Sequence, residues 1–399
     1  MRGDGTGYDA ARIEVLTGLE GVRKRPGMWV GSTTERGLHQ MAFEAVGWAV
    51  REVLATGAGC VDVTLTADGA VRVADDGPGV PFELPAAEGS DDLNGPGLEA
   101  LLTRLHAGHE FSGRDFVALS PVSTGIFVVN ALSSRLTAEV RHEGVGRNQE
   151  YVRGVPLAPP SVGTASTGSG TTITFWPDAE IFTTTQYSFA VLAERFRQVA
   201  FLNRGLTISL TDERPAGGPR LVRFRFPGGV RDFVAALSAE AGTAVEPDVI
   251  GFEREDPRMA GTMEVALLWG GSREKPMRGF ANSLVTFEGG THVDGFRDGV
   301  AAAVTAYARE RGLLTAADPD PAPDLIGTGL GLTAIVSVKL DRPEFLGATR
   351  TLLGNAEVRT CVREAVQEHL GGWFEEHPEE SVRVVERILQ SARPNDLPN

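Results

Sequence analysis

An amphipathic helix, followed by a hairpin that runs into a glycine-rich turn, constrains the N-terminal half of this chain most. Apolar side chains within residues 38–55 recur at helical spacing and form one stripe, while Glu44 lies on another side of the helix. Alternating apolar and polar residues over 61–73, with a tight turn between, predict a β-hairpin. The returning strand leads directly into residues 75–79, Asp-Asp-Gly-Pro-Gly. This order predicts a helix and a sheet in one layered domain, with a carboxylate at the end of a strand.

The composition limits the classes of protein that remain. A chain of 399 residues predicts about two or three domains, and 42% hydrophobic residues are ordinary for a packed protein. The formal net charge of −15 makes non-specific binding to phosphate backbones unfavourable. Two cysteines, Cys60 and Cys361, exclude a disulfide scaffold and a structural zinc site. No stretch is apolar enough for a signal peptide or a membrane span, so we expect a cytoplasmic globular protein.

Strand and helix patterns alternate in both halves of the chain. Further helices are expected near 98–106, 187–202, 230–239, 293–310, 355–372 and 378–392, and strands near 136–141, 149–153, 171–176, 222–226, 262–269 and 333–340. Asp, Pro and Gly residues at 212–221 indicate a boundary. We therefore expect one domain over 1–215, a second over 216–392 and a tail at 393–399, each domain an α/β or α+β sandwich.

Glu44 and the turn at 75–79 form the sharpest chemical feature. Asp75 at a strand end, beside two glycines, could accept a hydrogen bond from an amino group while the backbone approaches a planar ring. A nearby buried Glu44 could serve as general base for a water molecule. Taken alone, however, the two pieces favour a simpler interpretation, in which the turn is only a turn and Glu44 is a solvated helix residue.

Several ordered segments carry a resemblance to a known family. They are 22–31 (VRKRPGMWVG), 38–44 (LHQMAFE), 75–81 (DDGPGVP), 105–108 (LHAG), 128–132 (VVNAL), 288–292 (EGGTH) and 355–359 (NAEVR). In this order they resemble the B subunits of DNA gyrase and topoisomerase IV, from about residue 8 to about residue 391. The resemblance implies an α+β chain, in which an N-terminal GHKL (Bergerat) α/β sandwich with ATPase function precedes a ribosomal S5-like α/β transducer domain. The sequence has no Glu-Gly-Asp-Ser-Ala or Asp-x-Asp-x-Asp run, so we expect that this chain does not cut DNA by itself.

The metal side of the implied nucleotide site departs from the family. Glu44 matches the general base, but the Mg²⁺-binding Asn expected four residues later is Trp48, whose indole offers only an N–H donor. Two acidic positions of the family are Gly47 and Arg51 here. The sequence therefore predicts no metal site.

The phosphate side departs as well. The family's glycine-rich lid aligns with residues 119–125, Leu-Ser-Pro-Val-Ser-Thr-Gly, where only Gly125 remains. Pro121 has no N–H group to offer a phosphate, and Glu110 stands where the family has a cationic Lys. In the transducer loop, the family's Gln-Thr-Lys reads 348–350, Ala-Thr-Arg, so that Arg350 keeps a charge and the water-orienting amide is missing.

The adenine side matches the family better. Asp75, Gly79 and Thr171 occupy the positions of the family's adenine-recognition set, so the base end of the site is expected to persist. The resemblance thus implies ATP and Mg²⁺ as ligands, whereas the substitutions argue against the binding of both.

Three hypotheses for function follow. The first is a degenerate pseudo-ATPase that acts by protein association, as a modulator of gyrase or topoisomerase subunits. The second is a working ATPase with an altered lid, in which Glu44 is the general base and Arg350 contacts phosphate. The third is a site adapted to another small ligand, with Trp48 as a stacking surface.

The resemblance also implies partners. Tyr8 and Ile13 match the N-terminal arm that crosses the family's dimer, so we expect a homodimer. Arg223 and Arg225 alternate with Phe residues and share one strand face, for which solvent exposure is the preferred explanation and weak DNA contact the other.

Overall fold

A computed structural model describes most of the chain. The described residues are 18–82, 97–105, 113–114, 117–120, 124–165, 167–241, 249–269, 277–321, 323, 332–347 and 349–392. The predicted dimer arm with Tyr8 and Ile13, the lid residues 121–123, Glu110 and the tail at 393–399 lie outside them.

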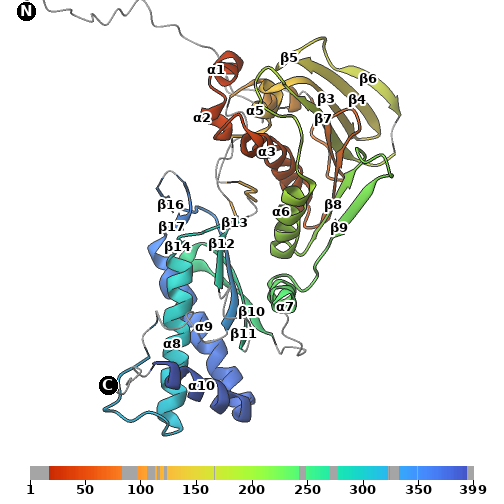
Figure 1. The fold of residues 1–399 in the computed structure, drawn as a ribbon. Coiled ribbons are helices and arrows are strands. Elements are labelled where there is room, and N and C mark those ends of the chain that lie inside the picture. The colour runs from red at the N-terminus through yellow and green to blue at the C-terminus, as the bar shows by residue number, and fades with distance from the viewer. Residues whose placement is uncertain are drawn as a thin grey trace, which may run out of the picture.

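The N-terminal domain is a mixed sheet with helices packed against it (Figure 1). The strand order is β5-β4-β3-β7-β2-β1-β8-β9, and β6 pairs with β4. The helices are α1 (Gly18–Lys24), α2 (Gly27–Val30), α3 (Glu35–Leu54), α4 (Leu98–Thr103), α5 (Ile126–Ala131) and α6 (Phe189–Leu202). The strands are β1 (Gly59–Leu65), β2 (Val71–Asp75), β3 (Ser133–His142), β4 (Val145–Val152), β5 (Val155–Pro156), β6 (Ser161–Ala165), β7 (Gly170–Pro177), β8 (Leu206–Asp212) and β9 (Arg220–Phe224).

Helix α3 is the central helix of this domain, and it is buried on more sides than the sequence predicts. The predicted apolar stripe packs against β1 and β2 as expected. Glu44, predicted on another side of the helix, is also buried, with 4% of its surface exposed, and so is Trp48, with 6%. The reason is tertiary, because α5 packs across this second side of α3.

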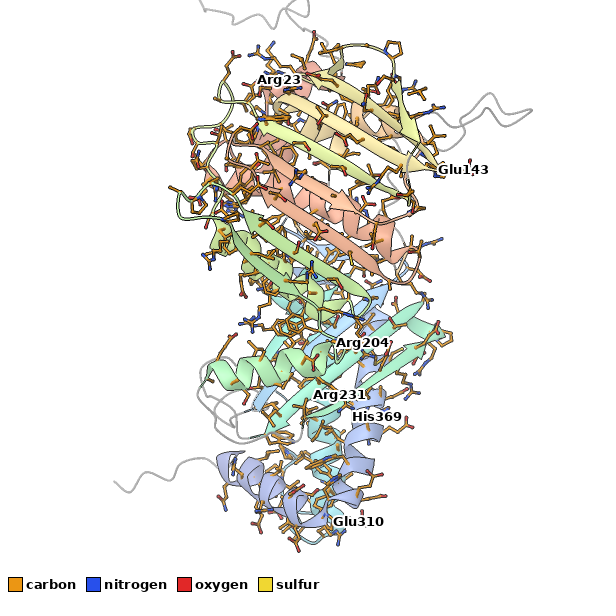
Figure 2. The ribbon with its side chains drawn as sticks, turned by 90° about the vertical axis from the view of Figure 1, so that its right-hand side faces the viewer. Arg23, Glu143, Arg204, Arg231, Glu310 and His369 are labelled. Carbon is orange, nitrogen blue, oxygen red and sulfur yellow. The ribbon has the colours of Figure 1, made fainter. Side chains whose placement is uncertain are left out.

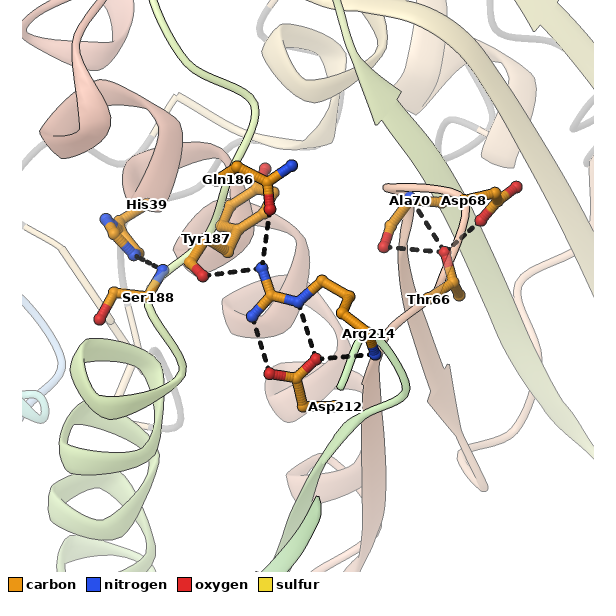
Figure 3. A network of polar contacts seen from close by, with 9 residues as sticks. All are labelled: His39, Thr66, Asp68, Ala70, Gln186, Tyr187, Ser188, Asp212 and Arg214. Atoms are coloured by element: carbon orange, nitrogen blue, oxygen red, sulfur yellow. Dashed lines mark hydrogen bonds and ion pairs between the residues drawn. The ribbon is translucent and has the colours of Figure 1, made fainter. Parts of the chain in front are cut away.

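Polar contacts hold the segment that leads into α6 against α3 and the end of β8 (Figure 3). His39 of α3 accepts the backbone N–H of Ser188 at 2.9 Å through Nε2, while its Nδ1 contacts the carbonyl of Glu35 at 2.8 Å. Arg214 pairs in bidentate fashion with Asp212 of β8, at 2.7 and 2.8 Å. Since Arg214 also donates to the carbonyl of Tyr187, the ends of α6 and β8 are held together.

The C-terminal domain has a second sheet with helices on both faces. Its strand order is β10-β11-β15-β12-β13, and a small sheet is ordered β14-β17-β16. The helices are α7 (Val230–Glu240), the 3-10 helix η2 (Pro257–Met259), α8 (Thr291–Glu310), α9 (Ala356–Glu376) and α10 (Pro378–Ala392). The strands are β10 (Ile250–Asp256), β11 (Gly261–Trp269), β12 (Met277–Ala281), β13 (Leu284–Val285), β14 (Gly289–Gly290), β15 (Leu332–Leu340), β16 (Phe345–Leu346) and β17 (Leu352–Leu353).

The alternation along β11 shows why two helical layers are needed. Val265 and Leu267 belong to a core shared with α8 and α9, whereas Ala266 and Leu268 belong to a core on the side of α7. Successive strand residues face opposite sides of a sheet, so each layer covers one face. The predicted helices at 230–239, 293–310, 355–372 and 378–392 are confirmed by α7 to α10.

The junction between the domains differs from the predicted boundary at 215/216. Strand β9, expected to open the second domain, pairs antiparallel with β8, so the first sheet continues to Phe224. The end of α6 reaches the second domain, because Phe201 and Leu202 pack in one core with Phe233 of α7. Figure 2 places Arg204 at this junction, where it pairs with Glu253 and Glu264 of the second domain at 2.9 and 3.3 Å. The predicted boundary was wrong because strand pairing across the 213–219 turn is not visible in a local pattern.

No helix within the described residues is both long and apolar enough to cross a membrane.

Candidate functional site

The Glu44 carboxylate is buried and bonded on both oxygens. Oε2 accepts the backbone N–H groups of Thr124 and Gly125 at 3.0 and 2.9 Å, and Oε1 accepts the side-chain amide of Gln40 at 3.0 Å. Gly125, with φ +86°, directly precedes α5. The two N–H groups that Glu44 holds therefore lie at the end of the predicted lid segment, next to a helix start.

Burial dominates the acidity of Glu44. Desolvation raises the pKa of this carboxyl to about 7, against the opposing effects of the Gly125 N–H bond and the nearby charge of Arg51. A carboxyl with such a pKa is half protonated near neutral pH, which is suited to proton transfer.

Asp75 and Thr171 come together from neighbouring strands. Asp75 ends β2, and its Oδ1 accepts the N–H groups of Gly77 and Thr171 at 3.0 and 3.2 Å. Its Oδ2 is buried and has no hydrogen-bond partner among the described residues. Desolvation raises the pKa of Asp75 to about 6. An unpartnered buried acceptor is costly, so this oxygen fits a ligand that brings an amino donor.

The packing of the backbone explains why residue 79 is a glycine. With φ +78°, a Cβ at this position would lie 2.3 Å from the backbone oxygen of Arg141. The close approach of two backbone segments thus requires glycine here, and a role of Gly79 in ligand recognition stays a prediction.

The described residues near Glu44 do not reproduce the metal ligands of the family. Trp48 packs in the core of the N-terminal domain, where an indole cannot coordinate a cation. Arg51 donates to the carbonyl of Val117 at 3.3 Å, and a Cβ added to Gly47 would lie 3.6 Å from its guanidinium. A cation therefore occupies one of the two positions that are acidic in the family and lies beside the other. No group of three or more His, Cys, Asp or Glu side chains within the described ranges could hold a metal.

The segment 117–120 is held in a way that sequence reasoning missed. The side chains of Gln40 and Ser120 hydrogen-bond each other, and Arg195 of α6 donates to the carbonyls of Ala118 and Leu119 at 3.0 and 2.9 Å. The i, i+4 spacing of Gln40 and Glu44 was a signal available in the sequence. Arg195 lies far along the chain, and no local pattern links it to this site.

Arg350 lies in the exposed turn between β16 and β17 in the second domain, with φ +52°. Residue 348 of the same loop lies outside the described residues. The contact of Arg350 with phosphate stays a prediction.

Comparisons with known proteins agree with this architecture. A family model described as "Histidine kinase-, DNA gyrase B-, and HSP90-like ATPase" matches residues 33–181, and one described as "DNA gyrase B" matches residues 229–396. The 43K ATPase domain of Thermus thermophilus gyrase B, solved in complex with an aminocoumarin, superposes with a TM-score of 0.76 at 34% identity, covering 94% of this chain and 95% of that one. The chain belongs to the gyrase B family. It comprises a GHKL ATPase domain and a transducer domain, as the sequence motifs predicted.

Full-length relatives are similar over nearly all of this chain. The DNA gyrase B protein of Streptomyces coelicolor is 43% identical over 401 residues, which cover 96% of this chain and 57% of the relative. The novobiocin-sensitive gyrase B protein of Streptomyces niveus is 42% identical, and the match covers 98% of this chain and 59% of the relative. The chain thus spans somewhat more than half the length of these relatives.

The family implies ATP with Mg²⁺, and the residues present fit only one end of that ligand. The unpartnered Asp75 Oδ2 and the adjacent Thr171 fit an amino-bearing base. The N–H groups of Thr124 and Gly125, suited to phosphate oxygens, are bonded to a carboxylate instead, and Trp48 cannot replace a metal ligand. The donor set therefore does not fit a Mg²⁺-bound triphosphate.

Proposed function

We propose that this chain is a gyrase B-like pseudo-ATPase, which keeps the ATPase and transducer folds but works by protein association and not by nucleotide hydrolysis. One observation carries the proposal. The carboxylate of Glu44 occupies the backbone N–H groups of Thr124 and Gly125, which lie where the family's lid presents N–H groups to the triphosphate. With Oε2 accepting both groups and Oε1 accepting Gln40, the carboxylate has less acceptor capacity left to orient a water molecule beside a phosphate.

Electrostatics support the proposal. A phosphate that replaced the Glu44 carboxylate on these amides would lie about 5 Å from it, where like unit charges repel by about 3 kcal/mol at an effective dielectric constant of about 20. Well above pH 7, where Glu44 is ionised, that repulsion corresponds to about a hundredfold loss of affinity, and at lower pH a protonated Glu44 relieves it. The family relieves such repulsion with Mg²⁺, whereas here Trp48 stands at the ligand position.

A working ATPase is the second candidate, and the acidity of Glu44 favours it. A buried carboxyl with its pKa raised to about 7 has the protonation behaviour of a general base. In that case Mg²⁺ would be held by phosphates and water, and the Glu44–Gly125 contact would open on binding. A site for another small ligand that stacks on Trp48 is disfavoured, because Trp48 lies in the core and offers no open stacking surface.

Association is proposed from the family. Relatives of this chain are named as DNA gyrase subunits, so we propose that the chain pairs with a gyrase or topoisomerase subunit or with a second copy of itself. The net charge of −15 disfavours DNA as its main partner. Light scattering on the full chain tests self-association, with a strict monomer at high concentration as the contrary result.

Calorimetric titration tests the loss of nucleotide binding. The full chain is titrated with a non-hydrolysable ATP analogue to millimolar concentration, with and without Mg²⁺ and at several temperatures. We expect no binding heat for the wild-type chain and no hydrolysis of ATP. Glu44→Gln removes the charge from the two amides and is expected to bind the analogue more tightly than wild type. Micromolar, Mg²⁺-dependent binding to the wild type, with turnover lost in Glu44→Gln, would establish the ATPase instead.

A second titration, with adenosine, examines the base end separately. Asp75→Asn is expected to weaken adenosine binding, because an amide group replaces the unpartnered carboxylate oxygen. Asp76→Asn is the matched control, since the Asp76 side chain accepts the N–H of Cys60.

A further inference from the structure

Arg195 is a partly buried cation that is bonded to carbonyl groups of both domains. Nε donates to Leu119 at 2.9 Å, and Nη2 donates to Ala118 at 3.0 Å and to Ser283 of the transducer domain at 2.9 Å. Nη1 contacts the side chain of Gln198 at 3.3 Å. Within the described ranges no carboxylate pairs with Arg195, and burial lowers its pKa to about 10. Burying a guanidinium without a counter-ion costs free energy, so the three carbonyl contacts must compensate for that cost.

The transducer side of this contact is a tight hairpin turn. Asn282 and Ser283 join β12 to β13, and both have a positive φ, +47° and +65°. The backbone N–H of Asn282 donates to Val338 at 2.8 Å, and its side chain exchanges two hydrogen bonds of 3.0 Å with the backbone of Leu340. Both acceptors belong to β15, an inner strand of the sheet. The turn is therefore fixed to the interior of the transducer domain.

Residues of the ATPase domain hydrogen-bond to the same turn. The N–H of Ala118 donates to the carbonyl of Asn282 at 3.0 Å, and Asn203 at the end of α6 donates to the hydroxyl of Ser283 at 3.1 Å. Arg195 thus closes a ring of contacts between the segment 117–120, α6 and the hairpin turn.

The segment 117–120 leads on to the nucleotide site. Ser120, directly after the residues that Arg195 holds, hydrogen-bonds Gln40, and Gln40 donates to Glu44. Glu44 in turn holds the N–H groups of Thr124 and Gly125. A continuous series of polar contacts therefore runs from Gly125 through Glu44, Gln40, the segment 117–120 and Arg195 to the turn between β12 and β13, which is bonded to β15.

We infer that Arg195 is the central positioning residue of a latch that couples Glu44 to the transducer sheet, so that a change at either end alters the other. The inference goes beyond the proposed function and holds whether or not nucleotide binds. Arginine suits the role because its fixed fork reaches three carbonyls at once, whereas the single ammonium group of lysine cannot replace that fork. Coupling of this kind is reciprocal.

Hydrogen exchange on the full chain tests the latch. Arg195→Met is expected to raise the exchange rates of the Ala118 and Asn282 amides by about 10- to 100-fold, because buried carbonyls lose their donor. The amide of Gly125 distinguishes coupling from a local effect, because Arg195 does not contact it. If the series transmits the change, the Gly125 amide should also exchange at least about tenfold faster. Arg195→Lys, which keeps the charge, should give the same pattern at smaller amplitude and replaces Arg195→Met should that variant not fold.

Arg197→Met is the matched control on the same helix. Arg197 also crosses the domain junction, pairing with Glu240 of α7 at 2.5 Å, but this pair is solvent-exposed. Its loss should leave exchange at Gly125 and Asn282 within about twofold of wild type. Unchanged Gly125 exchange in Arg195→Lys, with faster exchange confined to Ala118 and Asn282, would reduce Arg195 to a local support and overturn the inference.

A double-mutant cycle closes the test. Gln40→Leu breaks the series between Glu44 and the segment 117–120, and its effect on Asn282 exchange should be reduced at least about threefold in the Arg195→Lys background. Multiplicative, independent effects of the two substitutions would equally overturn the inference.

Discussion

Replacing Glu44 by glutamine should change how the stability of the ATPase domain depends on pH. The carboxyl has a pKa of about 7 in the folded chain, against 4.5 for an ordinary glutamate, because its charged form is desolvated. Because the folded state holds a proton that the unfolded state releases between these two pH values, the contribution of Glu44 to stability is greatest below pH 4.5. It falls as pH rises to about 7 and is level above that.

The size of the effect follows from the width of this window. Each pH unit between the two pKa values changes the free energy of unfolding by about 1.4 kcal/mol, so the ionisation of Glu44 by itself destabilises the wild-type fold by about 3 kcal/mol between pH 4.5 and pH 7.5. Glutamine has nearly the same shape and does not ionise. The Glu44→Gln variant should therefore gain about 3 kcal/mol relative to wild type across this range.

The difference in the free energy of unfolding is measured by urea unfolding at intervals of about 0.5 pH unit from pH 4.5 to pH 8. Tryptophan fluorescence and circular dichroism monitor the unfolding. Glu139→Gln removes an exposed carboxylate from β3 and shows the effect of charge removal alone. Parallel pH profiles for wild type and Glu44→Gln would refute the reasoning, since they would mean that the carboxylate is solvated or is compensated by a cation.

Two further substitutions, the first with a control, test the backbone and the core. Gly79→Ala should lower the free energy of unfolding by more than about 2 kcal/mol, because its Cβ would lie 2.3 Å from a carbonyl oxygen. Gly57→Ala, with φ +92° but open space around it, should lose only about 1 kcal/mol from strain, and equal losses in thermal denaturation would contradict this account. Trp48→Asn restores the residue type of the family's metal site, yet it should cost about 3 kcal/mol or more of stability and yield no Mg²⁺-dependent analogue binding by calorimetry. Tight Mg²⁺-dependent binding in that variant would show that Trp48 alone removed the metal.

Much of the fold was predictable because its signals are periodic. The stripe in residues 38–55 predicted α3. The strands predicted near 262–269 and 333–340 are β11 and β15, which pair in the transducer sheet. The boundary between the domains was not predictable in the same way. Strand β9 belongs to the first sheet only because it pairs with β8 across a turn, and pairing is a property of two segments.

Part of the functional site could likewise be predicted from the sequence, and part could not. By itself, the sequence determined which chemical groups are present: a carboxylate at 44, another at 75, an indole at 48 and no glycine-rich lid. These identities fix what each group can donate, accept or coordinate, and therefore the loss of the metal ligand. They could not show that both carboxyls have raised pKa values, because desolvation depends on what surrounds a residue.

Only the tertiary structure decided which partners those groups have. It placed the carboxylate of Glu44 on the amides of Thr124 and Gly125, eighty residues away, and it left one oxygen of Asp75 without a partner. It also brought Arg195 between the two domains. Hydrogen bonds act over about 3 Å, and residues far apart in sequence reach that distance only when whole helices and sheets pack together.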